Sequence, residues 1–327
     1  MRLSSRFSPR FSSRFSARFF TRFSPLLHST RFALVSCGLV ASLAGCGGDD
    51  VAAVPQRIAV SAAPNGIAVR AADGAVFITD DQTNGVLSSL DGHTFSHYAT
   101  VPAVAGQANS LSQLSFADAG TLMIERFGFG TASAVFSITG ADTIAPLSGP
   151  NPARRRLGLI SIGSNRLLST WFIKNGSAPP QGGLSLITYD PNAHTAVERD
   201  LLTALGKPVG VAVSGDTVYV SDQANNNIVK SSLSALLAGS QAVAPGATLA
   251  QINSPDLMAV DASGTLYTKC NTSGLCRIAP DGTTSLLAND FQDARGVAVD
   301  APRHLLYAVD RAGSTGGTSY VRTFPLN

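Results

Sequence analysis

Two stretches of this chain combine charged and aromatic side chains in a way that suits ligand binding. The first reads ERFGF from Glu125 to Phe129, and the second reads WFIK from Trp171 to Lys174 before a Pro- and Gly-rich segment. Aromatic rings beside Arg or Lys can hold an apolar, sugar-like or anionic ligand through stacking and charge. Arg126, Phe127 and Trp171 are therefore candidate ligand-binding residues. The same residues would also suit loops that only pack over the edges of neighbouring strands.

Two cysteines late in the chain form a second candidate feature. Cys270 and Cys276 are separated by five residues, and no histidine lies near them. This spacing is a weak pattern for a metal site. If the protein is exported, an oxidising compartment favours a disulfide that closes a hairpin. We predict the disulfide over free thiols or a metal site.

Several familiar catalytic patterns are missing from the sequence. It contains no GxSxG, no phosphate-binding Walker motif and no dinucleotide-binding fingerprint. The histidines after residue 50 are scattered and form no HxH or HExxH pair; they are His93, His97, His194 and His304. A histidine-based metal centre is therefore not predicted.

The composition predicts that strands position these side chains. Charged residues make up 14% of the chain and hydrophobic residues 44%, and there are 31 glycines. After residue 50, no long segment keeps helical periodicity with good helix formers. We expect an all-β protein.

One strand–turn–strand pattern recurs along the chain. Its clearest copy runs from Pro208 to Lys230, where two alternating apolar runs flank a Gly215-Asp216 turn and a third run begins at Ile228. The central residues of the first strand in the six copies are Ala68, Ser115, Ile160, Ala212, Ala259 and Ala298. The steps between them are 47, 45, 52, 47 and 39 residues. A period in the forties with mostly β content predicts a six-bladed β-propeller.

The propeller must close into a ring, because each blade buries its two apolar faces only against neighbours. We expect closure by a strand within Gln56–Ser61 that pairs with Tyr320–Phe324 of the last blade. The six blades then occupy residues 55–327 as one domain. Three aspartates recur at one blade position and are predicted to accept hydrogen bonds from the following turns; they are Asp80, Asp222 and Asp310.

The copies around Gly66, Gly210 and Gly296, with their PxGVAV and YVSD patterns, resemble NHL repeats. They also resemble the six-bladed, TolB-like family that includes senescence marker protein 30 and gluconolactonase. In this family the inner strand of each blade begins at the mouth of the channel where the second strand ends. The resemblance implies that Asn65, Asp256 and Arg295 lie at that mouth with Arg126, Phe127 and Trp171.

The resemblance also implies a possible metal site. The gluconolactonase-like enzymes hold a divalent cation with a Glu, one or two Asn and an Asp, and Ca²⁺ or Mg²⁺ suits such oxygen ligands. Asn65 and Asp256 match these residue types, and Glu125 would be the base that activates water. Val209, however, occupies another ligand position. Arg295 lies one blade from Asp256, where it would pair with the carboxylate and repel a cation.

The N-terminal segment has the order of a secretion signal. Arg-Phe pairs recur at steps of four up to Phe23, an apolar run from Phe32 to Ala44 is too short to span a bilayer, and Leu43-Ala44-Gly45-Cys46 follows. This tetrapeptide resembles the lipobox of bacterial lipoproteins. The resemblance implies a signal peptide over 1–45, acylation of Cys46, and a tether over 46–54. An ordinary signal peptide with an incidental cysteine is the alternative.

The charge distribution argues against nucleic acid as a partner. Seven of the 24 Lys and Arg residues precede Cys46 and none of the 21 Asp and Glu residues does, so the chain from Cys46 onward carries a net charge of −4. We therefore favour a lipid-anchored, periplasm-facing propeller, retained at the outer membrane, whose mouth binds a small ligand or protein partner. A metal-dependent lactone or ester hydrolase and a structural subunit of a cell-envelope complex are the alternatives.

Overall fold

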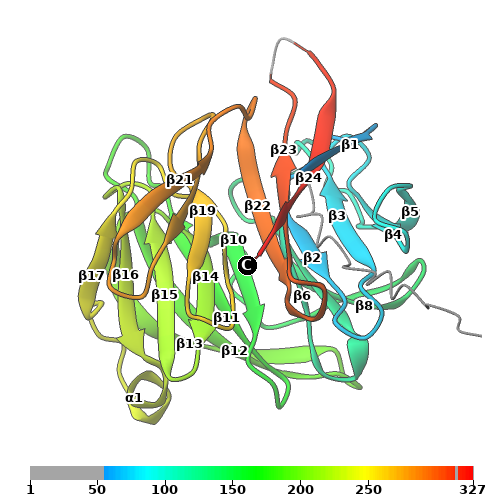
Figure 1. Cartoon of the computed structure of the whole chain (residues 1–327). Coiled ribbons are helices and arrows are strands. Elements are labelled where there is room, and N and C mark those ends of the chain that lie inside the picture. Colours follow the sequence, from blue (N-terminus) through cyan, green and yellow to red (C-terminus); the bar gives the residue numbers. More distant parts are fainter. Residues whose placement is uncertain (1–54, 314–315, 327) are drawn as a thin grey trace, which may run out of the picture. The chain divides into compact units, whose positions relative to one another are not determined.

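The computed structural model describes residues 55–313 and 316–326, and within them the chain is an all-β, six-bladed propeller (Figure 1). The described residues form six antiparallel four-stranded sheets, and the inner strands of successive blades contact one another around the ring. The predicted fold class is thereby confirmed. The N-terminal segment with Cys46 lies outside the described residues.

The first three blades hold twelve strands. Blade 1 contains β2 (Ile67–Val69), β3 (Val76–Asp80), β4 (Gly85–Ser89) and β5 (Ser96–Thr100). Blade 2 contains β6 (Leu111–Phe116), β7 (Leu122–Arg126), β8 (Ala134–Gly140) and β9 (Thr143–Pro146). Blade 3 contains β10 (Arg155–Ser161), β11 (Arg166–Ile173), β12 (Gln181–Asp190) and β13 (Thr195–Leu205).

The other three blades complete the ring. Blade 4 contains β14 (Pro208–Ser214), β15 (Thr217–Asp222), β16 (Asn227–Ser232) and β17 (Ala247–Gln251), with the short helix α1 (Leu233–Ala238) between the last two. Blade 5 contains β18 (Met258–Val260), β19 (Leu266–Lys269), β20 (Leu275–Ile278) and β21 (Thr284–Ala288). Blade 6 contains β22 (Ala294–Asp300), β23 (Leu305–Asp310), β24 (Ser319–Pro325) and, from the other end of the domain, β1 (Gln56–Val60). Two 3₁₀ turns lie at Asp118–Gly120 and Ala301–Arg303.

The ring closes as predicted, because β1 pairs antiparallel with β24. The register runs from Gln56 opposite Thr323 to Val60 opposite Ser319. Ile58 and Val60 point into the core, while Gln56 and Ala59 are exposed. The alternation of β1 therefore buries one face against the last blade.

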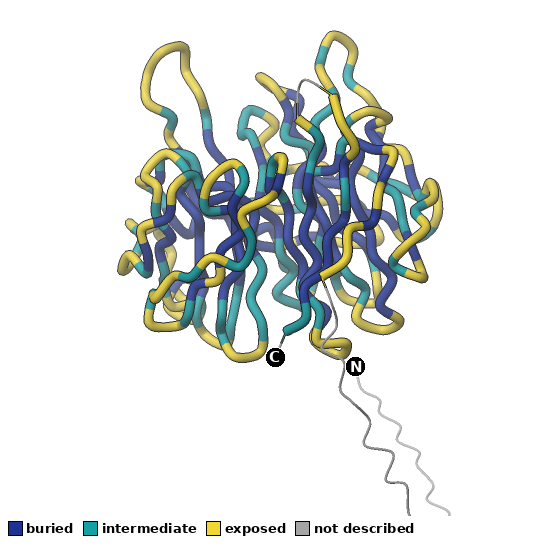
Figure 2. The backbone as a smooth tube through the Cα atoms, turned by 45° about the horizontal axis from the view of Figure 1, so that its top comes forward, coloured by how far each residue is buried: buried dark blue, intermediate teal, exposed yellow. Residues whose placement is uncertain are grey.

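The core lies between adjacent blades, and Figure 2 shows the buried residues in the strands and the exposed ones in the turns. Between blades 1 and 2, for example, Phe77, Leu114, Ile124 and Phe136 form one apolar cluster. The inner strands approach closely at glycine: a Cβ on Gly66 would collide with the carbonyl oxygen of Ser112 in the next blade. Small residues at the start of the inner strands thus let the ring close tightly.

The recurring aspartates accept backbone N–H groups, but mainly those of the segments that lead into the inner strands rather than those of the following turns. Asp80 Oδ1 accepts the N–H groups of Ala63 (2.8 Å) and Gln82 (3.0 Å). Asp222 accepts hydrogen bonds from the N–H groups before β14, and Asp310 accepts the N–H of Gln292 at 2.7 Å. Each carboxylate therefore ties the end of a second strand to the segment that leads into the inner strand.

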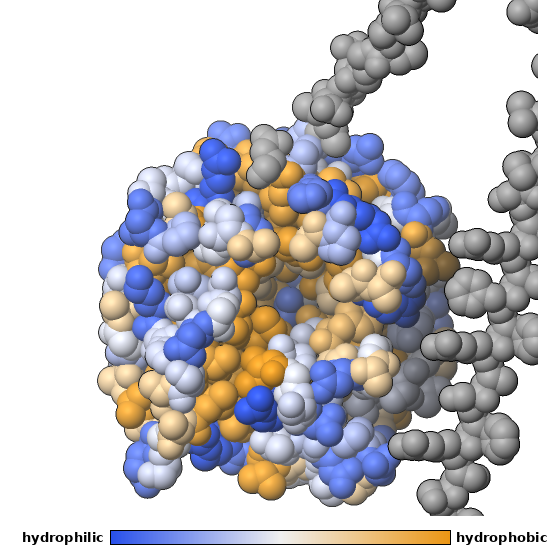
Figure 3. Space-filling model, turned by 60° about the horizontal axis from the view of Figure 1, so that its bottom comes forward, coloured by the Kyte–Doolittle hydropathy of each residue, from blue (hydrophilic) through white to orange (hydrophobic). Residues whose placement is uncertain are grey.

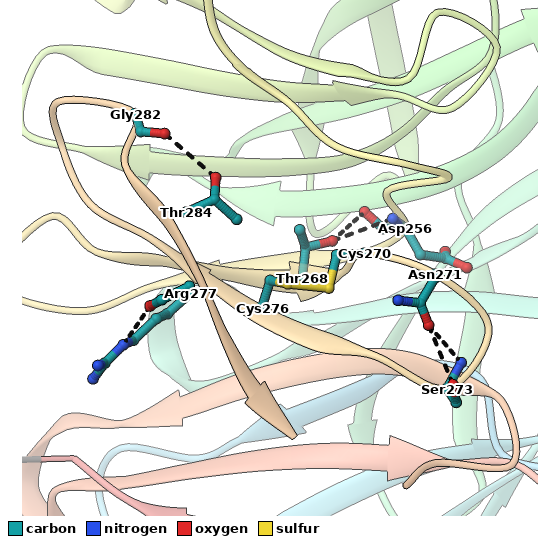
Figure 4. Close-up of a disulfide and its surroundings, with 10 residues drawn as sticks. Asp256, Thr268, Cys270, Asn271, Ser273, Cys276, Arg277, Gly282 and Thr284 are labelled. Carbon is teal, nitrogen blue, oxygen red and sulfur yellow. Dashed lines mark hydrogen bonds between the residues drawn. A yellow bond between two sulfur atoms is a disulfide. The ribbon is translucent and has the colours of Figure 1, made fainter. Parts of the chain in front are cut away.

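A disulfide joins Cys270 and Cys276 across the β19–β20 hairpin, with the two Cα atoms 5.7 Å apart (Figure 4). Beside it, Thr268 Oγ1 accepts the N–H of Asp256 at 3.2 Å and lies 3.0 Å from the carbonyl oxygen of Leu257. The hairpin is thus tied to the start of blade 5. No helix among the described residues is long and apolar enough to cross a bilayer.

Candidate functional site

The candidate site lies at the mouth of the channel, where the inner strands begin and the second strands end. This face holds the end of β23 and the start of β24, toward the top of Figure 1. One backbone hydrogen bond recurs there, from the residue after the second strand to a residue in the segment that leads into the inner strand. The pairs are Asp81 with Ala63, Phe127 with Ser110, Gln223 with Lys207, and Arg311 with Asp293. In blade 3, Phe172 and Arg155 are the corresponding partners in the strand register.

The opposite opening of the channel has a different character. Figure 3 shows apolar surface around a central hollow on that face. Several inner strands also end there in half-buried apolar side chains, namely Val69, Phe116, Val213, Val260 and Val299. At the mouth, by contrast, the starts of the inner strands carry charged side chains, among them Asp256, Asp293 and Arg295.

One half of the mouth, contributed by blades 2 to 4, is cationic and aromatic; we call its five residues the cationic–aromatic cluster. They are Phe127, Phe129, Arg155, Phe172 and Lys207. The ring of Phe127 lies 4.9 Å from that of Phe129 and 5.9 Å from that of Phe172. The Arg155 guanidinium lies 5.6 to 5.8 Å from all three ring centres, and the Lys207 amine lies 5.8 Å from that of Phe172. The cluster therefore places two cations over a shared aromatic surface.

The charges that act on Lys207 are mainly positive. Burial lowers the pKa of Lys207, and the nearby charges of Arg295, Lys174 and Lys269 lower it further, while Asp256 acts in the opposite direction. The Lys207 amine donates to Gln223 Oε1 at 2.5 Å. Lys207 thus lies near three other cations, of which Arg295 and Lys269 are paired with Asp293.

The other half of the mouth, from blades 5, 6 and 1, consists of ion pairs. Arg295 contacts Asp293 at 2.6 Å and Asp256 at 3.5 Å, and Lys269 contacts Asp293 at 2.6 Å. Arg311 pairs with Asp81 at 2.7 Å. These cations are already neutralised by neighbouring carboxylates, in contrast to those of the cationic–aromatic cluster.

Burial raises the pKa of Asp81, although the N–H of Leu111 and the charge of Arg311 both favour its ionised form. A cavity of about 850 Å³ borders this half of the mouth, and its walls include Gln82, Asp293, Arg295 and Arg311.

The structure places four of the predicted site residues at the mouth; three of them, Asn65, Asp256 and Arg295, are engaged in hydrogen bonds or ion pairs within the protein. Asn65 donates from Nδ2 to the carbonyl of Leu111 at 2.9 Å. Asp256, which is 4% exposed, accepts the N–H of Leu257 at 2.9 Å and contacts Arg295. Phe127 also lies at the mouth, within the cationic–aromatic cluster.

Arg126 and Trp171 lie elsewhere, which corrects their predicted place at the mouth. Arg126 donates to the carbonyls of Ala132 and Pro102, both at 2.7 Å, and so fixes the connection between blades 1 and 2. Trp171 is 8% exposed, and Arg154 covers its ring at 3.9 Å from the ring centre. Successive side chains of a strand point to opposite faces, so Phe172 takes the place expected for Trp171.

Glu125 also lies away from the mouth, buried between blades 2 and 3. Its side chain is fully buried, and it accepts a hydrogen bond from the hydroxyl of Ser169. Burial raises its pKa to about 8, against the opposing effects of the Arg156 charge and the Ser169 hydrogen bond. This position offers no route to a water molecule over the mouth, so the geometry does not support a base role for Glu125.

A polar network continues outward from Glu125. Arg156 donates to Ser169 Oγ at 2.9 Å and to Glu198 at 2.7 Å, and Arg154 contacts Glu198 and Asp200 at 2.7 and 2.6 Å. The run Arg154-Arg155-Arg156 is therefore divided by strand alternation. Its outer members enter the blade interface, and Arg155 alone faces the mouth cluster.

The mouth does not fit a divalent cation. Among the described residues, no group of three Asp, Glu, His or Cys side chains could hold a metal ion. Asp256 already contacts Arg295, and Lys207 and Lys269 add positive charge nearby. A bound cation would face three fixed positive charges, and the two nearby carboxylates, Asp256 and Asp293, are already paired with Arg295 or Lys269.

Sequence reasoning missed the residues that define the mouth most clearly. Arg155, Phe172, Lys207 and Asp293 all follow from the blade register, because each flanks a strand end that faces the mouth. The repeat pattern in the sequence contains these positions. They were overlooked because β10 and β14 begin before the glycine that served as the reference for each inner strand, and both strands carry a bulge near that glycine.

Comparisons with known proteins show the fold alone. The sequence matches no family model and no curated protein. Among solved structures, a luciferin-regenerating enzyme is 13% identical, with a TM-score of 0.63 over 84% of this chain and 96% of that one. A gluconolactonase from Xanthomonas campestris is 15% identical, with a TM-score of 0.64 over 84% of this chain and 89% of that one. The calcium-binding protein regucalcin from Agrobacterium tumefaciens is 14% identical, with a TM-score of 0.57 over 83% and 94%.

Proposed function

We propose that this protein is a binding module whose propeller mouth holds a small ligand. The observation that supports this most directly is the cationic–aromatic cluster, in which the Phe127 and Phe129 rings meet beside Arg155. Phe129 is 41% exposed, although most large apolar side chains of the described residues are buried. An exposed aromatic surface next to a cation is the kind of surface that ligands use.

The test is a thermal-shift screen of the full-length protein in detergent against a small-molecule library, with and without CaCl₂. Compounds that raise the Tm of the wild type should lose their effect in Phe127→Ser. They should keep it in Leu90→Ser, a matched change at a side chain that is 77% exposed on blade 1. Compounds that stabilise both variants equally would rule out binding through this cluster.

A metal-dependent lactone or ester hydrolase is the second candidate, because the gluconolactonase above shares the fold. The residues at the mouth do not support it, since Asp256 contacts Arg295 and Asn65 is bonded to Leu111. Under this alternative, CaCl₂ alone should raise the Tm of the wild type and Asp256→Ala should abolish the rise. Hydrolysis of lactones that depends on CaCl₂ would favour the hydrolase over the binding module.

The proposed location is the periplasmic side of the outer membrane, with lipid attached at Cys46. The supporting observation is the order of basic segment, apolar run and Leu-Ala-Gly-Cys in the sequence. Cys46→Ser should move the protein from the membrane fraction to the soluble fraction; continued membrane association would count against the anchor. A protein partner in an envelope complex is the remaining alternative, and nucleic acid is not a proposed partner.

A further inference from the structure

Arg155 differs from every other arginine of the described residues. The others each donate a hydrogen bond or contact a carboxylate: Arg57, Arg70, Arg126, Arg154, Arg156, Arg166, Arg199, Arg277, Arg295, Arg303, Arg311 and Arg322. Within residues 55–313 and 316–326, no acceptor lies within hydrogen-bond reach of the Arg155 guanidinium. A guanidinium has five N–H donors in a planar fork, and at the half-buried Arg155 they remain available.

The surroundings of Arg155 favour an anion. The Phe172 ring, which is 3% exposed, lies 5.8 Å from both the Arg155 guanidinium and the Lys207 amine, so the two cations share one aromatic neighbour. Lys207 has no carboxylate within ion-pair distance among the described residues and is bonded to Gln223. Within the described part of the chain both cations therefore lack a carboxylate in ion-pair contact, and an anion bound beside the Phe172 ring would be attracted by both.

The aromatic residues favour an apolar body on that anion. Phe127 and Phe129 meet edge to face, with an interplanar angle of 67°, and Phe129 extends toward solvent. A flat apolar ligand could pack on the exposed Phe129 ring while its charged group reaches the guanidinium. A carboxylate or phosphate matches the guanidinium fork with two parallel hydrogen bonds.

We propose that the cationic–aromatic cluster binds an organic anion, a carboxylate or phosphate monoester on an aromatic body, with Arg155 and Lys207 on the anionic group and Phe127 and Phe129 on the ring. This inference rests on the proposed binding function and names its ligand class. Arg295 and Arg311 take no part, because Asp293 and Asp81 already neutralise them.

The experiment measures dissociation constants by isothermal titration calorimetry for the full-length protein in detergent. The probes are 2-naphthoate, 2-naphthyl phosphate and the uncharged 2-naphthamide. At least one anion should bind 10-fold or more tightly than the amide, and the Kd should rise with NaCl concentration. Comparison of the two anions distinguishes a carboxylate from a phosphate ligand.

Arg155→Gln and Lys207→Gln should each weaken binding of that anion by 10-fold or more. The control is Arg277→Gln, which changes an exposed arginine on β20 that is bonded to Ser285 and should leave the Kd unchanged. Equal binding of anion and amide, or equal Kd values for Arg155→Gln and Arg277→Gln, would overturn the anion assignment. Absence of binding by both anions would overturn it too.

The two proposals can fail separately. If uncharged library compounds lose their Tm effect in Phe127→Ser while neither anion binds, the mouth binds ligands but not anions. If no compound distinguishes Phe127→Ser from Leu90→Ser, the proposed binding function itself fails.

Discussion

Glu125 is a carboxyl group held away from water by the packing of two blades. One oxygen accepts a hydrogen bond from Ser169, and the other is buried without a hydrogen-bond partner. Burial disfavours the charged form more strongly than Arg156 favours it, so the folded protein keeps a proton on Glu125 up to a pKa of about 8.

This residue should make stability fall as pH rises. The pKa of Glu125 is raised in the folded state above its ordinary value of 4.5, so its contribution is fully present below about 4.5 and is lost as pH rises toward about 8. In that window the free energy of unfolding should decrease by up to about 1.4 kcal/mol per pH unit relative to Glu125→Gln, which carries no titrating proton. Urea unfolding of both proteins between pH 5 and pH 8.5 measures the difference.

Glu198→Gln is a useful comparison for that experiment. Glu198 has a lowered pKa because Arg156 and Arg154 outweigh its burial, so its contribution is present above its unfolded pKa and is lost as pH falls. Between pH 5 and pH 8.5 Glu198 should therefore add little pH dependence, because its contribution changes below its unfolded pKa of 4.5, whereas the Glu125 contribution falls across that range. Parallel stability curves for the wild type and Glu125→Gln would contradict the raised pKa.

For individual residues, the sequence predicted the strand end at which a residue lies better than it predicted the direction of the side chain. It placed Asn65, Asp256 and Arg295 at the mouth correctly, because each precedes or follows the start of an inner strand. It misplaced Arg126, Trp171 and Glu125, because a one-residue difference along a strand moves a side chain to the opposite face. The partner strands β6 and β10 carry bulges opposite these residues, and a bulge shifts the register by one residue.

The turn of the β19–β20 hairpin is stabilised both by hydrogen bonds and by a disulfide. The turn is held by a backbone hydrogen bond from the N–H of Cys270 to the carbonyl of Gly274, and by Asn271 Oδ1, which accepts the N–H of Ser273 at 3.0 Å. The disulfide between Cys270 and Cys276 adds a covalent link across the same turn. A short closed loop restricts the unfolded chain less than a long one.

Removing this link should cost a moderate amount of stability. We expect Cys270→Ser with Cys276→Ser to lower the free energy of unfolding by about 2 kcal/mol, and the Tm by about 4 °C. Thermal melting with and without dithiothreitol measures the effect. The reductant should lower the Tm of the wild type to that of the double variant and leave the variant unchanged; an unchanged wild-type Tm would argue against a stabilising disulfide.

Strands in which apolar and polar residues alternate were predicted well. Elements inserted between the strands of the repeat were not. The first and second strands of all six blades lie where the pattern placed them. The helix α1 was not predicted, although Ser232 accepts the N–H of Ala235 as an N-cap and Gly239 follows the helix. It is a single short insertion between two strands, and six residues carry too little periodicity for detection.

The ring depends on pairing between the two ends of the domain. Deleting Gln56–Ala62 removes β1 and exposes the edge of β24, so the whole domain should be destabilised together. Ile58 and Val60 are 8% and 6% exposed, and their loss alone should cost about 3–6 kcal/mol. Thermal melting should show a large drop in Tm, and an unchanged transition would defeat this prediction.

Point variants of β1 distinguish the effect of losing its buried side chains from the effect of losing the strand itself. Ile58→Ser with Val60→Ser should reproduce most of the destabilisation, because both side chains face the core. Gln56→Ser with Ala59→Ser changes the exposed positions of the same strand and should stay within about 0.5 kcal/mol of the wild type.

The pairing of β1 with β24 also constrains when the protein can fold. Gln56 and Thr323 are 267 positions apart in sequence, so the contact that completes blade 6 is among the most non-local in the domain. During synthesis β1 is the first strand of the domain to be made, and it cannot pair until its partner β24, the last strand of the domain, has been made. A chain that stops before Ser319 has no partner strand for β1, and its ring stays open with an apolar blade face exposed. Closure of the ring therefore distinguishes a complete chain from a truncated one, and incomplete products should be readily degraded by proteases.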